Sequence, residues 1–238
     1  MEQVQVKIKG EFKKFWESES RNIYLNKPIS CEGERVQIRS NIRESPDGAK
    51  GVFLLLPINW VWEAPPENPI RLDECLMKDL HLKNENLDEI LKIEAELKKE
   101  YQKGRLRKRQ ANIQHAFEKF TERLLGDLGL TQSLTYERPS LQQISDFDFL
   151  IRRGKESVSL EVKSDKFRST GNISLELMRD YRRSFDDPLN TGSLLKTRAD
   201  LWQVYFYDTE EKKFDSRVFR VQNLLQKALE FFTLCLPD

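Results

Sequence analysis

Apolar and polar positions follow one another along this chain in patterns that predict both strands and helices. Apolar residues at every second position, or in short continuous runs, predict strands over 4–8, 34–42, 51–56, 144–151, 157–163, 172–177, 203–207 and 215–220. Apolar residues that recur every three or four positions predict helices over 72–80, 86–103, 110–128 and 221–234. Gly129 is expected to cap the third of these helices.

The interleaved order of these elements predicts an α/β fold in which helices flank a mixed sheet. Residues 1–105 are expected to form an N-terminal α+β region that ends in a helical arm. Residues 106–238 are expected to form the core domain that the arm precedes.

The segment 144–163 predicts a β-hairpin with two unlike faces. With Gly154 and Lys155 at its tip, Phe149 lies opposite Leu160 and the apolar side chains share one face. The charged side chains then share the other face.

On the charged face, the same register places Asp148 opposite Glu161 and Asp146 opposite Lys163. Like charges directly across a sheet repel each other, so the first pair needs a reason. A bound divalent cation is the simplest reason. In a plain surface hairpin Lys163 would instead serve as the partner of Asp146, which leaves the first pair unexplained.

These residues also carry a family resemblance. Asp148 before the apolar run 149–151, followed by Glu161-Val162-Lys163 on the next strand, resembles the PD-(D/E)XK nuclease superfamily. Phe147 stands where that superfamily often has a proline.

The resemblance continues downstream, where 169–176 reads STGNISLE and 197–202 reads TRADLW. These segments look like the phage and bacterial branch with a TGN…E and then a T-x-A-D pattern. The resemblance covers about residues 110–232 and implies a restriction-endonuclease-like core.

The resemblance implies a magnesium or manganese site. Asp148, Glu161 and the carbonyl of Val162 would be the metal ligands, and Lys163 would orient the attacking water or stabilise the developing charge. Glu118, on the helix before the sheet, would add a ligand or act through water. Glu122 is the second candidate for this role if Glu118 does not fill it. Alternatively, Glu118 is an ordinary solvated carboxylate on the helix surface. Possible supporting residues are Asp146, Asn172 and Glu176.

Two basic groups are candidates for binding nucleic acid through its phosphates. They are Lys103, Arg105, Arg107, Lys108 and Arg109 in one segment, and Arg179, Arg182 and Arg183 in another. Solvated helix faces would show the same basic runs, so both interpretations stay open.

Composition excludes several other classes of protein. The 238 residues carry a net charge of +1, and no apolar run is long enough for a membrane span, so we expect a cytoplasmic protein with no membrane partner. Cys31, Cys75 and Cys235 fit neither a disulfide framework nor a zinc site. His81 and His115 lie near no nucleophile motif, and no phosphate-binding glycine loop occurs.

The expected function is therefore that of a metal-dependent endonuclease acting on DNA, in restriction, phage defence or phage DNA processing. The cell would be a bacterium or a phage-infected one, and the N-terminal region would serve specificity, sensing or oligomerisation. A homodimer is implied by the resemblance. The alternatives are a non-catalytic nucleic-acid-binding or structural subunit on the same fold, and a nuclease that acts on RNA.

Overall fold

The computed structural model describes residues 28–31, 34–40, 52–139, 147–166, 168–179 and 191–234. The chain divides into two compact units. The first comprises Met1–Val61, Gly171–Thr197 and Val221–Asp238, and the second comprises Trp62–Thr170 and Arg198–Arg220. This division differs from the predicted boundary after residue 105, because the second unit takes residues from both sides of it. The predicted strand 4–8 lies outside the described residues.

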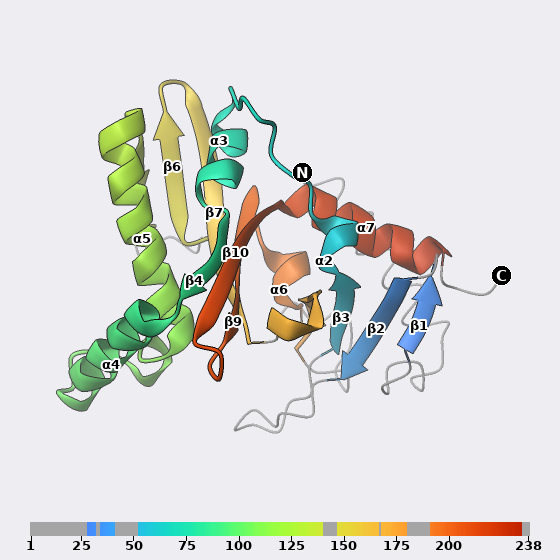
Figure 1. Cartoon of the computed structure of the whole chain (residues 1–238), viewed down its shortest axis with the longest axis horizontal. Helices are drawn as coiled ribbons and strands as arrows, with labels where there is room; N and C mark the ends of the chain where they lie inside the picture. Colours follow the sequence, from blue (N-terminus) through green and yellow to red (C-terminus); the bar gives the residue numbers. More distant parts are fainter. Residues whose placement is uncertain are drawn as a thin grey trace. The chain divides into compact units, whose positions relative to one another are not determined.

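The first unit contains a four-stranded antiparallel sheet in the order β1-β2-β3-β8 (Figure 1). Its elements are β1 (Pro28–Cys31), β2 (Glu34–Ser40), β3 (Val52–Pro57), β8 (Asn172–Met178), α2 (Ile58–Val61), α6 (Ser193–Lys196) and α7 (Val221–Leu234). The strands predicted within 34–42, at 51–56 and at 172–177 are confirmed, as is the helix 221–234. β8 pairs with β3, so it belongs to this sheet and not to the sheet that contains the hairpin.

The second unit contains a mixed six-stranded sheet in the order β4-β10-β9-β7-β6-β5. Its strands are β4 (Leu82–Asn86), β5 (Thr135–Glu137), β6 (Phe149–Arg153), β7 (Glu156–Asp165), β9 (Leu201–Asp208) and β10 (Lys213–Arg220). β7 and β9 are parallel, and the other neighbouring strands are antiparallel. The predicted α/β class, with a mixed sheet flanked by helices, is therefore confirmed at this level.

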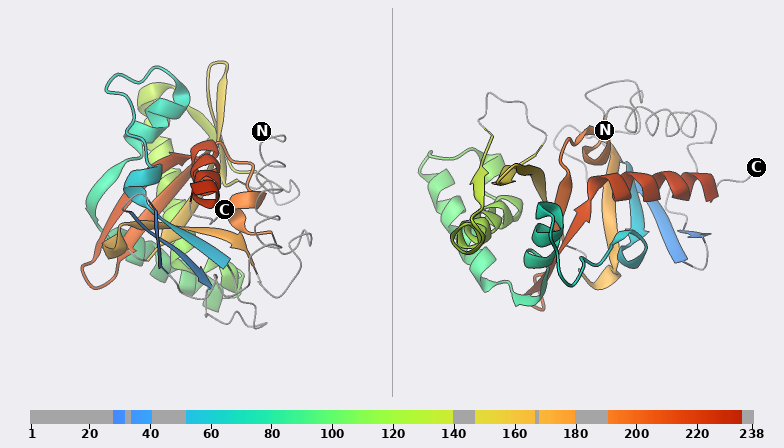
Figure 2. Two further views of the ribbon diagram at one scale, coloured as in Figure 1. Left: turned by 90° about the vertical axis from the view of Figure 1, so that its right-hand side faces the viewer. Right: turned by 90° about the horizontal axis from the view of Figure 1, so that it is seen from above.

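The helices of the second unit are α3 (Leu72–Asp79), α4 (Asp88–Gln102) and α5 (Ile113–Gln132), with short 3₁₀ turns at Lys108–Gln110 and Arg168–Thr170. α4 packs on α5, as Figure 2 shows for the two green helices, and α5 packs on β7. Gly129 does not cap α5, because the helix continues to Gln132 and ends at Ser133 in the left-handed conformation. A Cβ at Gly129 would lie 3.1 Å from the carbonyl oxygen of Leu134, so this glycine permits a close approach.

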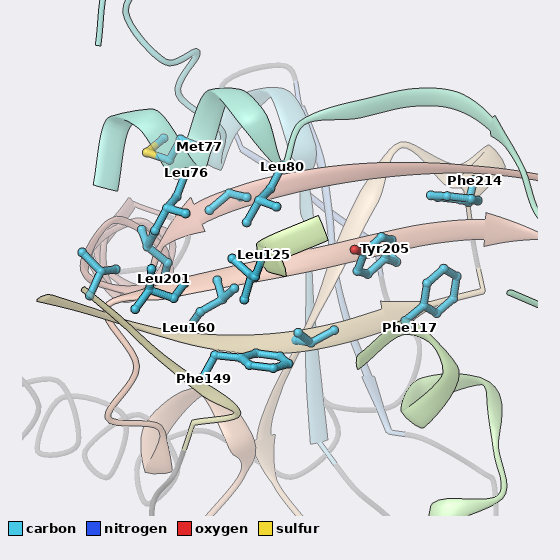
Figure 3. Packing of buried hydrophobic residues seen from close by; sticks show 14 of the residues in the cluster. Leu76, Met77, Leu80, Phe117, Leu125, Phe149, Leu160, Leu201, Tyr205 and Phe214 are labelled. Atoms are coloured by element: carbon cyan, nitrogen blue, oxygen red, sulfur yellow. The ribbon is translucent and has the colours of Figure 1, made fainter. Parts of the chain in front are cut away.

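One hydrophobic core joins the helices to the sheet of the second unit. Phe117 of α5 stacks on Tyr205 of β9, and Phe149 and Leu160 lie next to each other across β6 and β7 (Figure 3). Leu76 of α3 is buried in the same core. The alternation predicted for the hairpin thus places its apolar side chains in the core.

The hairpin register is the predicted one. Phe149 pairs with Leu160 and Ile151 with Val158, and the turn falls at Gly154 and Lys155. Gly154 has φ +59°, a left-handed conformation that glycine adopts without a steric penalty.

Candidate active site

The site lies where β6 begins. Its first paired residue is Phe149, and Asp148 precedes the strand. The amide of Asp148 donates to the carbonyl of Leu160 at 2.9 Å, and Oδ2 of Asp148 accepts from the amide of Val162 at 2.8 Å. A carboxylate therefore takes the place of the next main-chain acceptor in the ladder. This explains why an acidic residue there can be accommodated beside β7.

The main chain of Val162 faces the same side of β7 as that of Leu160, because residues two apart in a strand direct their backbone groups alike. Its carbonyl oxygen accepts from Nε2 of Gln114 on α5, at 2.7 Å. The same nitrogen lies 3.4 Å from Oε1 of Glu118. Gln114 therefore links two of the oxygens that the sequence analysis selected as metal ligands.

Glu118 is held from three sides. Besides Gln114, Nδ1 of His115 lies 2.7 Å from its Oε2, and Nη2 of Arg138 donates to the same oxygen at 3.3 Å. Burial raises the pKa of Glu118, but the bonds and charges of His115 and Arg138 and the bond from Gln114 outweigh it and lower the pKa overall. The side chain is 16% exposed, so it is not an ordinary solvated helix carboxylate. Glu122, the second candidate, pairs with Lys119 instead.

Asp148 is the most perturbed acid of the site. Burial, together with the negative charges of Glu118 and Glu161, raises its pKa from the ordinary 3.8 to about 6. The amide of Val162 and the charge of Lys163 oppose this rise. Burial is the largest of these causes, so the anion of Asp148 is unfavourable in the folded protein.

Glu161 and Lys163 form an ion pair on β7. The indole Nε1 of Trp202 donates to Oε2 of Glu161 at 2.8 Å, and the ammonium of Lys163 lies 5.3 Å from the centre of the Trp202 ring. Glu161 and Trp202 are register partners on the parallel strands β7 and β9. Each carboxylate of the predicted pair thus has its own donor, so the argument that repulsion between Asp148 and Glu161 requires a cation was incomplete.

The T-x-A-D motif has a structural role in this fold. Oδ2 of Asp200 accepts from the amide of Ser159 at 2.9 Å and from its hydroxyl at 2.7 Å. The amide of Asp200 donates back to the Ser159 hydroxyl at 2.9 Å. These bonds tie the start of β9 to β7 and hold Glu161 and Trp202 on adjacent strands.

Not all the predicted site residues lie in the described part of the unit that holds Asp148. Asp146, Arg182 and Arg183 lie outside the described residues. Asn172 and Glu176 belong to β8 of the first unit, where Oε2 of Glu176 accepts from the amide of Ser193 at 2.9 Å.

The basic residues at the end of α4 are exposed. Lys103 and Arg105 both pair with Glu100, at 3.0 and 3.1 Å. Arg107 and Lys108 are exposed, Arg109 lies in the following 3₁₀ turn, and Arg179 is exposed just after β8. This arrangement fits a solvated surface and a phosphate-binding surface equally well.

Gln114, His115, Arg138 and Trp202 are site residues that the sequence analysis missed. A signal existed for the first, because Gln114 and Glu118 are four residues apart on a predicted helix and must share a face. Arg138 and Trp202 reach the site through tertiary contacts, for which the local sequence gives no signal.

Comparisons with family models, with curated proteins and with solved structures gave no match for this chain. Within the described ranges, no three His, Cys, Asp or Glu side chains are grouped closely enough to hold a metal ion by themselves. None of the described helices is long and apolar enough to cross a membrane. These comparisons therefore assign neither a family nor an activity to the chain.

Proposed function

We propose that this protein is a metal-dependent nuclease that hydrolyses phosphodiester bonds in DNA. The observation that carries the proposal is Asp148, a part-buried carboxyl with a pKa raised to about 6 next to the carboxylates Glu118 and Glu161 and the main chain of Val162. Strongly perturbed acids in such surroundings are typical of functional sites.

The donor set suits a hard divalent cation. Mg²⁺ prefers oxygen ligands, keeps several waters and binds proteins through one or two carboxylates plus substrate phosphate. Asp148 and the carbonyl of Val162 would supply oxygen ligands, and Glu118 and Glu161 would add negative charge. When bound, the ion would lower the pKa of the attacking water and offset charge on the phosphate.

Lys163 would assist the attack on the phosphate. Its ammonium is held by Glu161 and by the ring of Trp202 on the face of β7 away from the core. A fixed cation there orients a water molecule and stabilises charge that develops on the phosphate. The exposed basic residues after α4 would contact neighbouring phosphates and supply sequence-independent affinity.

Cleavage of supercoiled plasmid tests this proposal. The full-length protein should nick or linearise the plasmid in Mg²⁺ or Mn²⁺ and not in EDTA. Asp148→Ala and Lys163→Ala should each lose about 10²-fold or more in rate, because each removes a preorganised charge. Asp127→Ala, an exposed change on α5, is the control and should cut normally.

The cleavage products, or their absence, separate the remaining alternatives. Nicked or linear plasmid tells whether one strand or two are cut, and an RNA substrate run alongside tests the RNA alternative. If the wild type binds DNA without cutting it, and both variants bind equally well, the protein is not a nuclease of this kind. That result would favour a nucleic-acid-binding subunit.

A further inference from the structure

The side-chain amide of Gln114 lies between the carbonyl of Val162 and the carboxylate of Glu118. Its nitrogen donates to the carbonyl of Val162 at 2.7 Å and lies 3.4 Å from Oε1 of Glu118. Both partners accept hydrogen bonds and cannot donate, which fixes the nitrogen, and not the oxygen, of the amide on this side. The residue is part-buried on the face of α5 that packs on β7.

The two oxygens joined by this amide lie beside the proposed cation site. An N–H group carries partial positive charge, so it stabilises clustered oxygens when no cation does. The other atom of the same amide, Oε1, is a ligand type that divalent cations accept in proteins. Gln114 can therefore serve the site in both states, as a donor without the ion and as an acceptor with it.

We propose that Gln114 belongs to the metal site and exchanges its donor for its acceptor when a divalent cation binds. This inference depends on the proposed metal-dependent function and adds a residue to it. Rotation of the side-chain amide is enough for the exchange. No change of the fold is required.

Gln114→Glu gives the sharpest test, because it replaces the donor by a second acceptor of the same shape. In EDTA at about pH 8, the variant should melt at a lower temperature than the wild type, because it sets an acceptor against two other acceptors, the Val162 carbonyl and Glu118. Added Mg²⁺ or Mn²⁺ should stabilise it more than the wild type. The half-saturating metal concentration should fall by about tenfold, because ligand charge sets the affinity of such sites.

Gln114→Met keeps the size of the side chain and removes both donor and acceptor. Its half-saturating metal concentration should rise. Gln132→Glu is the matched control, because Nε2 of Gln132 donates to Oδ2 of Asp79 at 2.8 Å on the same helix α5, outside the site. That variant should lose stability in EDTA and respond to metal like the wild type.

The outcomes separate this inference from the function on which it depends. A residue with a merely structural role would lower the melting temperature equally with and without metal, and that result in both Gln114 variants would overturn the inference while leaving the metal site intact. If Mg²⁺ and Mn²⁺ fail to stabilise even the wild type, the proposed metal site and the inference both fail.

Discussion

Asp148 is held by its main chain and its side chain at once, between Leu160 and Val162 of β7. The carboxylate is fixed in place by these bonds, and burial and the neighbouring charges of Glu118 and Glu161 make its anion unfavourable. A group kept in a costly ionisation state is a common feature of binding and catalytic sites. The cost should be measurable as a pH-dependent loss of stability.

Asp148→Asn should stabilise the metal-free protein at neutral pH. The folded pKa of about 6 exceeds the ordinary 3.8, a rise that corresponds to roughly 3 kcal/mol above pH 6. The folded state then binds more protons than the unfolded state between these values, so wild-type stability falls as pH rises through 6. The amide oxygen of the variant can still accept from Val162.

Urea unfolding in EDTA checks this prediction. The stability advantage of Asp148→Asn should be largest at neutral pH and shrink towards about pH 4, where wild-type Asp148 is protonated. Asp127→Asn, an exposed change on α5, should show little effect. A variant less stable than the wild type at neutral pH would contradict the raised pKa.

At the scale of elements, helix α5 carries much of the site. Gln114, His115 and Glu118 lie on it within two turns and share one face, and Phe117 anchors the same stretch in the core. The helix ends at Ser133, whose φ of +54° is left-handed and unfavourable for a residue with a Cβ.

Ser133→Gly should raise the free energy of unfolding by about 1 kcal/mol, because glycine adopts the left-handed conformation without a steric cost. Thr131→Gly, two residues earlier in the same helix, should lower it by a similar amount. Urea unfolding of both variants measures the difference. An equal loss of unfolding free energy in both variants would show that the left-handed conformation of Ser133 is not strained.

Local patterns predicted the hairpin well. The register that places Phe149 opposite Leu160 follows from the alternation and the turn alone. The position of β9 beside β7 was beyond this reasoning, because strand order depends on contacts between distant parts of the chain. β8 shows this, since its alternation was read correctly although it pairs with β3.

One strand was missed and one helix end was misplaced for local reasons. β4 is exposed along most of its length, and its sequence LKNEN shows no alternation that would predict a strand. It forms by pairing with β10 at the edge of the sheet. Gly129 looked like a helix end, but the helix continues past it, and the glycine instead permits the close approach of the carbonyl of Leu134.

At the scale of the whole molecule, the two units are interleaved along the chain. The second unit takes α3, β4 and α4 from before residue 105 and the rest of its sheet from after it. Leu76, Leu80 and Ile90 are fully buried parts of the same core as Phe117 and Phe149. Neither half of the chain therefore contains a complete core.

A fragment of residues 106–238 should fail to fold alone, because removal of these helices exposes the core. Circular dichroism and thermal unfolding of the fragment should show no cooperative transition, in contrast to the full chain. Addition of the separate fragment 1–105 should partly restore the cooperative transition. A fragment 106–238 that unfolds cooperatively by itself would contradict the interleaved arrangement.

The proposed nuclease activity depends on one physical event, the binding of a divalent cation beside Asp148, Glu118 and the carbonyl of Val162. Replacing Mg²⁺ by Fe²⁺ and adding ascorbate and peroxide produces radicals at the bound ion, which cut the nearby backbone. We expect fragments that map to cuts near residues 118, 148 and 161–163, lost in Asp148→Asn and suppressed by excess Mg²⁺. Cuts elsewhere, or cuts unchanged in Asp148→Asn, would contradict a metal site at Asp148.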